Sequence, residues 1–305
     1  MSADVVCLAS WNADLVSRVP RPVARGETLL ASSFEISPGG KGSNAAVAAA
    51  RQGARVAVVA RIGNDEFGQM ALDLWHAEGL LTEHVERVDG ERSGVAQIHV
   101  FDDGDNAIAV YPGAGAGLSE RHAESARDTI VQARVLMAPC EVPMPALLEA
   151  FSIARAGRAI TVLNPAPARP LPDRLLPLVD VLTPNESELR LLAGVGDDAS
   201  LADAAQVLLA RGATAVLVTL GGRGCCLYRG GEVPHALSGR SMAVVDTIGA
   251  GDTFTGALAA ALARGTPLCE AMEWANAAAA LSVTGRGAIA GMPTREQVGD
   301  LLRDR

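Results

Sequence analysis

The sequence is poor in residues that several classes of protein need. Only 3% of its 305 residues are aromatic, so the hydrophobic core must be built mainly from Ala, Val, Leu and Ile. The five cysteines form no CxxC pair, and Cys225 and Cys226 are adjacent, which suits neither a disulfide framework nor a zinc site. Lysine occurs once, as Lys41, and the rest of the 26 basic residues are Arg. This pattern indicates a role for Lys41 that a guanidinium does not fill.

The chain also lacks an excess of positive charge and a long apolar run. With 26 basic and 35 acidic residues its net charge is −9, which argues against a dedicated nucleic-acid-binding protein. No apolar run reaches the roughly 18–20 residues of a membrane helix, and the N-terminus has no basic stretch typical of a signal peptide. Unpaired thiols favour a reducing compartment. We therefore expect a cytoplasmic protein that binds neither nucleic acid nor membrane.

Short β-branched runs alternate with longer helical patterns along most of the chain. This order predicts a mostly parallel sheet covered by helices on both faces. Asn185 with Glu188, and Thr294 with Gln297, have the spacing of capping boxes at helix starts. The predicted strands are 5–9, 55–60, 135–138, 159–163, 181–183, 215–219, 225–228 and 242–245. The predicted helices are 43–51, 67–78, 145–156, 186–193, 201–211, 252–264, 268–283 and 295–302.

Two stretches break this alternation, at about residues 11–38 and 92–111. Neither has helical periodicity, and the second reads as a hairpin with its turn at residues 102–105. We expect both to join in one small β-sheet that projects from the main sheet as a lid, inserted in a single domain of residues 1–305. Because an isolated small sheet has exposed edges, we also expect two chains to pair through the lid as a homodimer.

The first motif with chemical potential is Gly39, Gly40, Lys41 and Gly42, followed by Ser43 and Asn44 at the start of a predicted helix. Glycines before a helix N-terminus let a ligand approach the backbone closely. The motif is not a Walker A loop, which needs Ser or Thr directly after the Lys. A Gly-rich turn without a ligand is the alternative.

The second motif spans residues 246–256 and reads DTIGAGDTFTG. A predicted strand ends at Asp246, and a helix begins near Asp252. The free N–H groups of Gly249, Ala250 and Gly251 would point at one spot, which the helix dipole makes positive. Such a spot would stabilise a phosphoryl group in transfer, and Asp252 could take a proton from an attacking hydroxyl.

Two alternatives stand beside this interpretation of the second motif. Asp252 could be only a favourable carboxylate in the first turn of a helix. Gly249, Gly251 and Gly256 also loosely imitate a dinucleotide-binding GxGxxG, but their spacing is wrong and they do not lie in the first βαβ unit.

Together the two motifs resemble the signatures of the ribokinase/PfkB family of sugar kinases, and the likeness runs over nearly the whole chain. Five further segments follow in the family's order: residues 12–14 (NAD), 164–167 (NPAP), 183–186 (TPNE), 219–224 (TLGGRG) and 276–280 (NAAAA). The resemblance implies a three-layer α/β/α fold with a mostly parallel central sheet and a small β-sheet lid. It implies ATP-dependent phosphorylation of the primary 5-hydroxyl of D-ribose, which gives D-ribose 5-phosphate.

The sequence leaves other activities open. A kinase of another furanose or of a nucleoside, such as deoxyribose, fructose or adenosine, would fit the same fold. A sugar-binding regulator without catalysis is a further alternative, but binding alone has no need of Asp252 and its glycine turn.

The resemblance also implies roles for individual residues. Asp252 would be the general base, and Gly249, Ala250 and Gly251 would form the anion hole. The sugar would be held by Asn12, Asp14, Gly39, Gly40, Lys41, Asn44, Glu141 and Asp252. ATP would contact Asn185, Thr219, Gly221, Gly222, Gly224, Gly251 and Asn276. Mg²⁺ would arrive with ATP, with Glu186 as the nearest holder of its water shell. A potassium ion would be bound by the Asp246 carboxylate and by Ile248, Ser282, Gly285, Gly287 and Gly291.

Three positions depart from the family's pattern. Gly291 stands where a Ser hydroxyl is usual, which weakens the expected potassium site. Asn276 replaces a frequent His, and Pro139 replaces a polar residue two positions before Glu141. The last change makes the identity of the sugar less certain than the chemistry.

Overall fold

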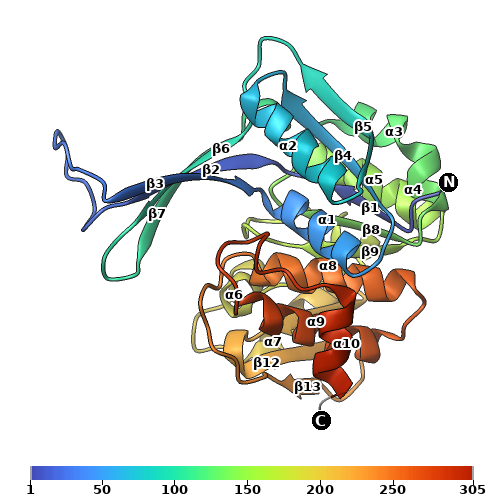
Figure 1. Cartoon of the computed structure of the whole chain (residues 1–305). Coiled ribbons are helices and arrows are strands. Elements are labelled where there is room, and N and C mark those ends of the chain that lie inside the picture. Colours follow the sequence, from blue (N-terminus) through green and yellow to red (C-terminus); the bar gives the residue numbers. More distant parts are fainter. Residues whose placement is uncertain (1, 304–305) are drawn as a thin grey trace.

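A computed structural model describes residues 2–303 of the chain (Figure 1). Its main sheet has the strand order β13-β12-β11-β10-β9-β8-β1-β4-β5. Neighbours from β11 to β5 run parallel, and β12 and β13 are antiparallel additions at one edge. The strands are β1 (Val5–Leu8), β4 (Val56–Gly63), β5 (Leu81–Val88), β8 (Val135–Pro139), β9 (Ile160–Asn164), β10 (Val181–Leu182), β11 (Ala215–Thr219), β12 (Gly224–Arg229) and β13 (His235–Ser238).

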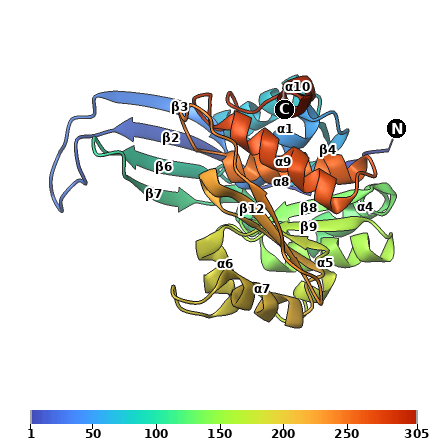
Figure 2. The same ribbon diagram turned by 90° about the horizontal axis from the view of Figure 1, so that it is seen from below.

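Helices cover both faces of this sheet, as Figure 2 shows edge-on. Alternate residues of β1 separate the two cores: Val5 and Cys7 pack with one set of helices, and Val6 and Leu8 with the other. The first set is α1 (Lys41–Arg51), α2 (Glu66–Ala77), α8 (Ala250–Ala263), α9 (Leu268–Ser282) and α10 (Arg295–Arg303). The second set is α3 (Glu120–Ser125), α4 (Arg127–Gln132), α5 (Met144–Ala156), α6 (Glu186–Ala193) and α7 (Leu201–Ala210).

The second sheet is the lid, a four-stranded arm that extends from the body in Figure 1. Its order is β3-β2-β6-β7, and its strands are β2 (Asn12–Arg18), β3 (Ser33–Gly39), β6 (Val95–Val100) and β7 (Asn106–Tyr111). Segments far apart in the sequence thus pair in one sheet, with β2 parallel to β6. The expected three-layer fold with a mostly parallel sheet and a separate lid is confirmed.

The local predictions agree with most elements and fail at a few. Residues 242–245, predicted as a strand, are an irregular loop, so that prediction is wrong. The strands β5 and β13 and the short helices α3 and α4 were not predicted. Both predicted capping boxes form, with Glu188 N–H donating to Asn185 Oδ1 at 2.8 Å and Gln297 N–H to Thr294 Oγ1 at 3.4 Å. Among residues 2–303, no helix has the length and apolar character that a membrane span needs.

Candidate active site

The site forms where α8 begins, beside the carboxyl ends of the parallel strands. Gly249 precedes the helix with a φ of 77°, a left-handed conformation that suits glycine. The Ala250 N–H donates a hydrogen bond to Thr247 O at 3.3 Å. Among the described residues, the N–H groups of Gly251 and Asp252 have no acceptor. The Gly249 N–H likewise has no acceptor in the described part of the chain. Of the three amides that the sequence predicts to be open, those of Gly249 and Gly251 are open, and that of Ala250 is engaged.

Asp252 is buried in the first turn of α8, with 5% of its surface exposed. Asn44 Nδ2 donates to its Oδ2 at 2.9 Å, and Asn164 Nδ2 lies 3.4 Å from its Oδ1. Burial raises the pKa of Asp252 to about 6, although Lys41 and the Asn44 hydrogen bond act against the rise. A carboxylate with this pKa is suited to accept a proton near neutral pH.

The N-terminus of α1 lies next to that of α8, but its amide N–H groups already donate to other groups of the protein. Glu141 Oε2 accepts from the Lys41 N–H at 2.9 Å, and Ser10 Oγ accepts from the Gly42 N–H at 3.0 Å. Ser10 O accepts the Ser43 N–H at 3.1 Å, and Ser10 Oγ also donates to Glu141 Oε2 at 2.6 Å. These contacts satisfy the amides that a helix start otherwise leaves open.

The glycines of the first motif make room for the chain itself. A Cβ on Gly40 would lie 2.6 Å from Ser10 O, and one on Gly42 would lie 2.6 Å from the Ala9 Cα. A Cβ on Gly39 would fall 2.2 Å from an oxygen of Asp14. These glycines thus let α1 and β3 press against the start of β2.

Lys41 is the first residue of α1, and its ammonium has no carboxylate oxygen within ion-pairing distance in the described part of the chain. Burial lowers its pKa, but the charges of Asp252, Glu141, Glu188 and Asp14 outweigh this effect, so the pKa is raised. The group stays cationic, and it can neutralise an anion placed between these carboxylates.

The lid supplies two further polar side chains. Asn12 is buried at the start of β2, with its Oδ1 so close to the Gly94 Cα that a Cβ there would lie 2.4 Å away. Burial raises the pKa of Asp14 to about 7, and the charge of Glu141 adds to the rise. Asn12, Asp14, Lys41, Asn44, Glu141 and Asp252 are thus brought to one place.

The predicted nucleotide residues lie at the start of α6, in the turn between β11 and β12, and in α9. Asn185 caps α6 and bridges to Thr219, where β11 ends. Gly221 and Gly224 bound a short turn with φ values of 57° and 99°. Asn276 Nδ2 donates to Ser238 O at 3.0 Å, so this amide is engaged with β13.

The predicted potassium ligands lie in two loops joined by Asp246. Its Oδ1 accepts from the Ile248 N–H at 3.0 Å and its Oδ2 from the Gly287 N–H at 2.9 Å. The carbonyls of Ser282 and Gly287 each accept a long hydrogen bond from within the loop, at 3.4 and 3.3 Å. A Cβ on Gly291 would lie 2.4 Å from Ser282 O. Gly291 is thus required for the loop's close packing.

Comparison with known proteins identifies the family of the chain. The model of the pfkB family carbohydrate kinases matches residues 2–295. The chain belongs to this family of kinases. It is 39% identical over 304 residues to a ribokinase of Haemophilus influenzae, with 99% of each chain covered. It is 32% identical over 302 residues to a deoxyribokinase of Salmonella typhi, with 98% of each covered.

The fold of this kinase is also that of solved relatives. A ribokinase of Arabidopsis thaliana, solved in complex with ribose and ATP, superposes with a TM-score of 0.94 at 31% sequence identity. The alignment covers 99% of both chains. The protein is therefore a carbohydrate kinase with a ribokinase-like fold.

Three residues of the candidate site have no role there in the sequence-based predictions. Ser10 closes α1, Asn164 borders Asp252, and Glu188 raises the pKa of both Lys41 and Asp252 by its charge. Asn164 and Glu188 lie within or beside segments that the resemblance flags, so a signal existed for them. Glu186 is engaged elsewhere, in an ion pair with Arg223.

Proposed function

We propose that this carbohydrate kinase transfers the γ-phosphoryl group of ATP to the primary 5-hydroxyl of D-ribose, and that residues 1–305 act as one catalytic unit. The observation that carries the proposal is Asp252, a buried carboxylate with a raised pKa beside open helix amides. A binding protein without catalysis would have no need of this combination, since a buried carboxylate costs stability.

In the proposed reaction, Asp252 accepts the proton of the 5-hydroxyl as its oxygen forms a bond to the γ-phosphorus. The bond between that phosphorus and the bridging oxygen of ADP breaks, and the electron pair leaves with ADP. The open N–H groups of Gly251 and Asp252 at the positive end of α8 stabilise charge on the transferring group. Lys41 contributes a second positive charge from α1.

The ribose hydroxyls are held by Asn12, Asp14, Asn44 and Glu141. Asn44 supports this role because its Oδ1 is buried and has no hydrogen-bond partner among residues 2–303, while its Nδ2 donates to Asp252. An unpaired buried acceptor is costly, so a sugar hydroxyl that donates to it would be favoured. Gly39 and Gly40 shape the wall by packing rather than by direct contact.

ATP lies along Asn185, Thr219, Gly221, Gly222 and Gly224 toward Asn276, with Mg²⁺ bound to its phosphates. Of the two acidic residues after Asn185, Glu188 fits the metal's water shell better than Glu186. Glu188 lies close enough to shift the pKa of Asp252 and Lys41, and its Oε1 carries no hydrogen bond among the described residues. The metal, when bound, neutralises phosphate charge.

A potassium ion would bind between the two loops that Asp246 joins. Its ligands would be the Asp246 carboxylate and the carbonyls of Ile248, Ser282, Gly285 and Gly287. Carbonyl and carboxylate oxygens suit a hard cation. Gly291 offers no side-chain oxygen and leaves no space for one, so we expect weak activation by potassium.

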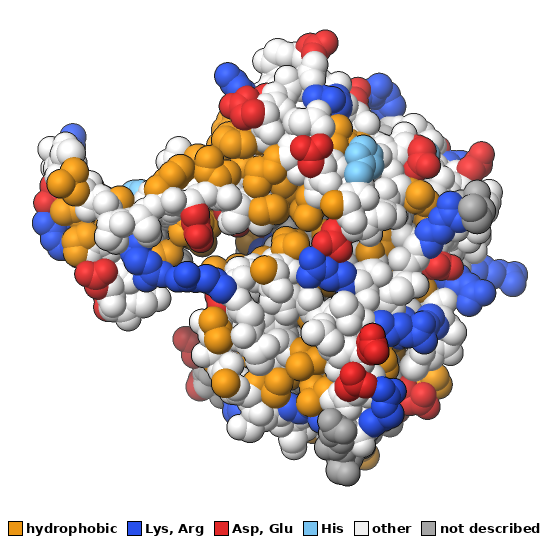
Figure 3. All heavy atoms as spheres, viewed as in Figure 1, with side chains coloured by type: hydrophobic (Ala, Val, Ile, Leu, Met, Phe, Trp, Pro, Cys, Tyr) orange, Lys and Arg blue, Asp and Glu red, His pale blue; other side chains and the backbone are white. Residues whose placement is uncertain are grey.

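We further infer that two chains pair through the lid. Phe34, Ile36 and Tyr111 are 60%, 48% and 59% exposed, and their register places them on the lid face opposite Asp14. Figure 3 shows hydrophobic side chains along this arm. A second copy would cover this face and the open edges of β3 and β7. Sedimentation at micromolar concentration should show a dimer, and a monomer would contradict the inference.

An assay of ADP release across a panel of sugars tests the substrate. We expect the highest kcat/KM with D-ribose, and the deoxyribokinase relative makes deoxyribose the first competitor. A preference for deoxyribose, fructose or adenosine would refute the ribose assignment. No ADP release with any sugar or nucleoside would contradict the proposed catalytic site.

A further inference from the structure

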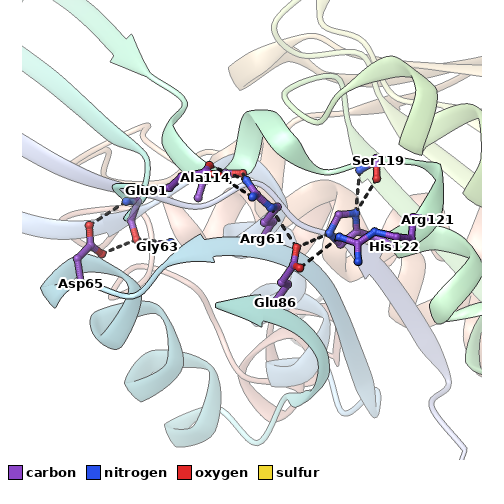
Figure 4. A network of polar contacts seen from close by, with 10 residues as sticks. Arg61, Gly63, Asp65, Glu86, Glu91, Ala114, Ser119, Arg121 and His122 are labelled. Atoms are coloured by element: carbon purple, nitrogen blue, oxygen red, sulfur yellow. Dashed lines mark hydrogen bonds and ion pairs between the residues drawn. The ribbon is translucent and has the colours of Figure 1, made fainter. Parts of the chain in front are cut away.

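A polar network holds the β6–β7 hairpin of the lid to the edge of the main sheet (Figure 4). One leg of the hairpin is residues 91–94, just before β6, and the other is residues 112–117, just after β7. We call these two segments the lid legs. Neither leg contains a residue proposed above to contact sugar or ATP.

The first leg is held by Asp65, which also caps α2. Asp65 Oδ2 accepts from the Ser93 N–H at 2.9 Å, and Oδ1 accepts from Ser93 Oγ at 2.6 Å and from Gly68 N–H at 2.8 Å. Ser93 Oγ in turn accepts from the Gly63 N–H at 3.0 Å. The Asp65 side chain is only 6% exposed, so these bonds are shielded from water.

Arg61 holds both legs together. Its Nη1 and Nη2 donate to the two oxygens of Glu91, each at 2.7 Å, and Nη1 donates to Ala114 O at 2.8 Å. Its Nε donates to Glu86 Oε2 at 3.1 Å, which ties the guanidinium to β5. The Arg61 side chain is only 13% exposed, so its two-pronged contact with Glu91 is largely shielded from water and can hold the two legs in a fixed position.

Glycines allow the legs to press directly onto the body. A Cβ on Gly63 would lie 2.4 Å from Glu91 O, and one on Gly113 would lie 2.4 Å from Arg92 O. A Cβ on Gly117 would lie 2.3 Å from Arg61 Nη1. Backbone and guanidinium are thus packed too tightly for either leg to shift alone.

The first leg connects directly to the sugar side of the lid. Gly94, next to Ser93, accepts the Ala13 N–H at 2.9 Å through its carbonyl. A Cβ on Gly94 would lie 2.4 Å from Asn12 Oδ1 and 2.4 Å from Trp11 O, so both atoms pack directly against the Gly94 backbone. A displacement of Ser93 and Gly94 would therefore move Asn12.

We propose that Asp65 and Arg61 are positioning residues that hold the lid legs and thereby fix Asn12 against the sugar. This inference rests on the proposed function, because it takes Asn12 as a sugar contact. The two residues act through Ser93 and Gly94 and do not contact substrate. A loosened leg should weaken sugar binding in ground state and transition state alike, which raises KM and leaves kcat nearly unchanged.

Two variants loosen the lid legs without deleting a proposed sugar contact. Asp65→Ser keeps a good N-cap for α2 but removes the oxygen that binds the Ser93 N–H. Gly117→Ala keeps the Arg61 side chain but displaces its Nη1, which donates to Ala114 O of the second leg and to Glu91 of the first. We expect each to raise the KM for sugar about tenfold, with kcat and the KM for ATP within about twofold of wild type.

Arg211→Met is the matched control. Arg211 is also a partly buried Arg bound to a carboxylate and two carbonyls, Asp173, Leu171 and Leu192, but it lies far along the chain from the lid legs. We expect it to lower the melting temperature without changing the KM for sugar. If Asp65→Ser and Gly117→Ala behave like this control, the network serves stability alone and the proposal is wrong.

A double-mutant cycle gives the sharper test. With Asn12→Ala already present, Asp65→Ser should raise the KM for sugar no further, because the side chain that it positions is gone. Full additivity of the two effects would overturn the link through Gly94. The assay uses whichever sugar the wild type phosphorylates best, so a wrong ribose assignment and a wrong positioning role give different results.

Discussion

The starts of α1 and α8 look alike in sequence and differ in chemistry. Both follow a glycine turn, and the helices pack so closely that a Cβ on Gly256 of α8 would lie 2.3 Å from Ala45 O of α1. The amides of α1 are satisfied by Glu141 and Ser10. Those of Gly251 and Asp252 in α8 have no acceptor in the described part of the chain. A glycine turn before a helix thus predicts a close backbone approach, but remote side chains decide whether an anion can use it.

The largest effect on catalysis should come from a change in α8, the helix whose first amides are open. Asp252→Asn keeps the shape of the side chain and removes its basicity, so we expect kcat to fall by about 10²–10⁴-fold. Sugar affinity should change little, because the amide can still contact Asn44. Stopped-flow or coupled measurement of ADP release gives the rate, and equilibrium titration gives the affinity. A rate near that of wild type would show that Asp252 is not the base.

The same variant should be more stable than wild type at neutral pH. Burial raises the pKa of Asp252 from 3.8 to about 6, so the charged form is penalised in the folded state by up to about 3 kcal/mol. The penalty is present above pH 6 and disappears as the pH falls toward 4. Urea denaturation at pH 7.5 and pH 4.5 measures this, and an equal difference in stability at both pH values would contradict the raised pKa.

The pH profile of the wild type should reflect the same group. Because Asp252 must be ionised to accept a proton, kcat/KM should fall about tenfold per unit below a pKa near 6. Asp14, with a pKa raised to about 7, titrates nearby and should alter KM for sugar more than kcat. A profile that is flat between pH 5 and 8 would exclude Asp252 as the base.

Lys41 begins α1, and its ammonium feels the charge of Asp252 in the first turn of α8. The backbone N–H of Lys41 donates to Glu141, whereas its ammonium forms no ion pair with the described carboxylates. In Lys41→Arg the wider, planar guanidinium should misplace the charge, so we expect kcat or the KM for sugar to worsen about tenfold with the melting temperature unchanged. Wild-type kinetics in this variant would show that the Lys41 ammonium has no specific role in catalysis or sugar binding.

Ser10→Ala should show the opposite pattern to Asp252→Asn. It removes an acceptor from the Gly42 N–H and a donor to Glu141, so we expect a loss of about 1 kcal/mol of stability. The chemical step should slow by no more than a few-fold, because α1 is not the helix with open amides. Denaturant midpoints and kcat on the same preparation compare the two. A large loss of kcat with full stability would mean that α1 takes part in phosphoryl transfer.

The smallest effect concerns potassium beside α8. We expect activation by potassium over sodium of only about two- to threefold, since Gly291 supplies no oxygen ligand. Gly291→Ser should not strengthen the activation, although it restores the hydroxyl that is usual at this position, because its Cβ would meet Ser282 O at 2.4 Å. Initial rates in matched chloride salts measure this, and strong activation of the Ser variant would show that the loop rearranges.

Local patterns predicted much of this molecule. The alternation of strands and helices predicted the layers. The glycine turn before Asp252 predicted the open amides of Gly249 and Gly251 but missed that Ala250 is engaged and that Asp252 is open among the described residues. Strand β5 was missed because its Glu83, Glu86 and Arg87 resemble a solvated segment, although it forms the sheet edge. Residues 242–245 were misread because Val244 and Val245 are β-branched yet 64% and 62% exposed. Exposure is a property of the fold that β-propensity does not reveal.

Contacts between distant segments could not be predicted. The closure of α1 joins Ser10 and Glu141, which are 131 positions apart. The support of Asn12 depends on Asp65 and Ser93, which no sequence pattern links. The resemblance to known kinases named the residues, but only the packing shows that Gly40 and Gly42 accommodate the chain.

The single lysine has a consequence for proteolysis. A protease specific for lysine has one target bond in the whole chain, between Lys41 and Gly42, and this bond lies in the first turn of α1. Cleavage requires that turn to open and release Glu141 and Ser10, so the cutting rate at limiting protease reports the opening equilibrium of one helix end. Few proteins offer a cut site confined to the place where two substrates are expected to meet. Protection by sugar alone, by ATP alone and by both would then measure how each ligand closes that end.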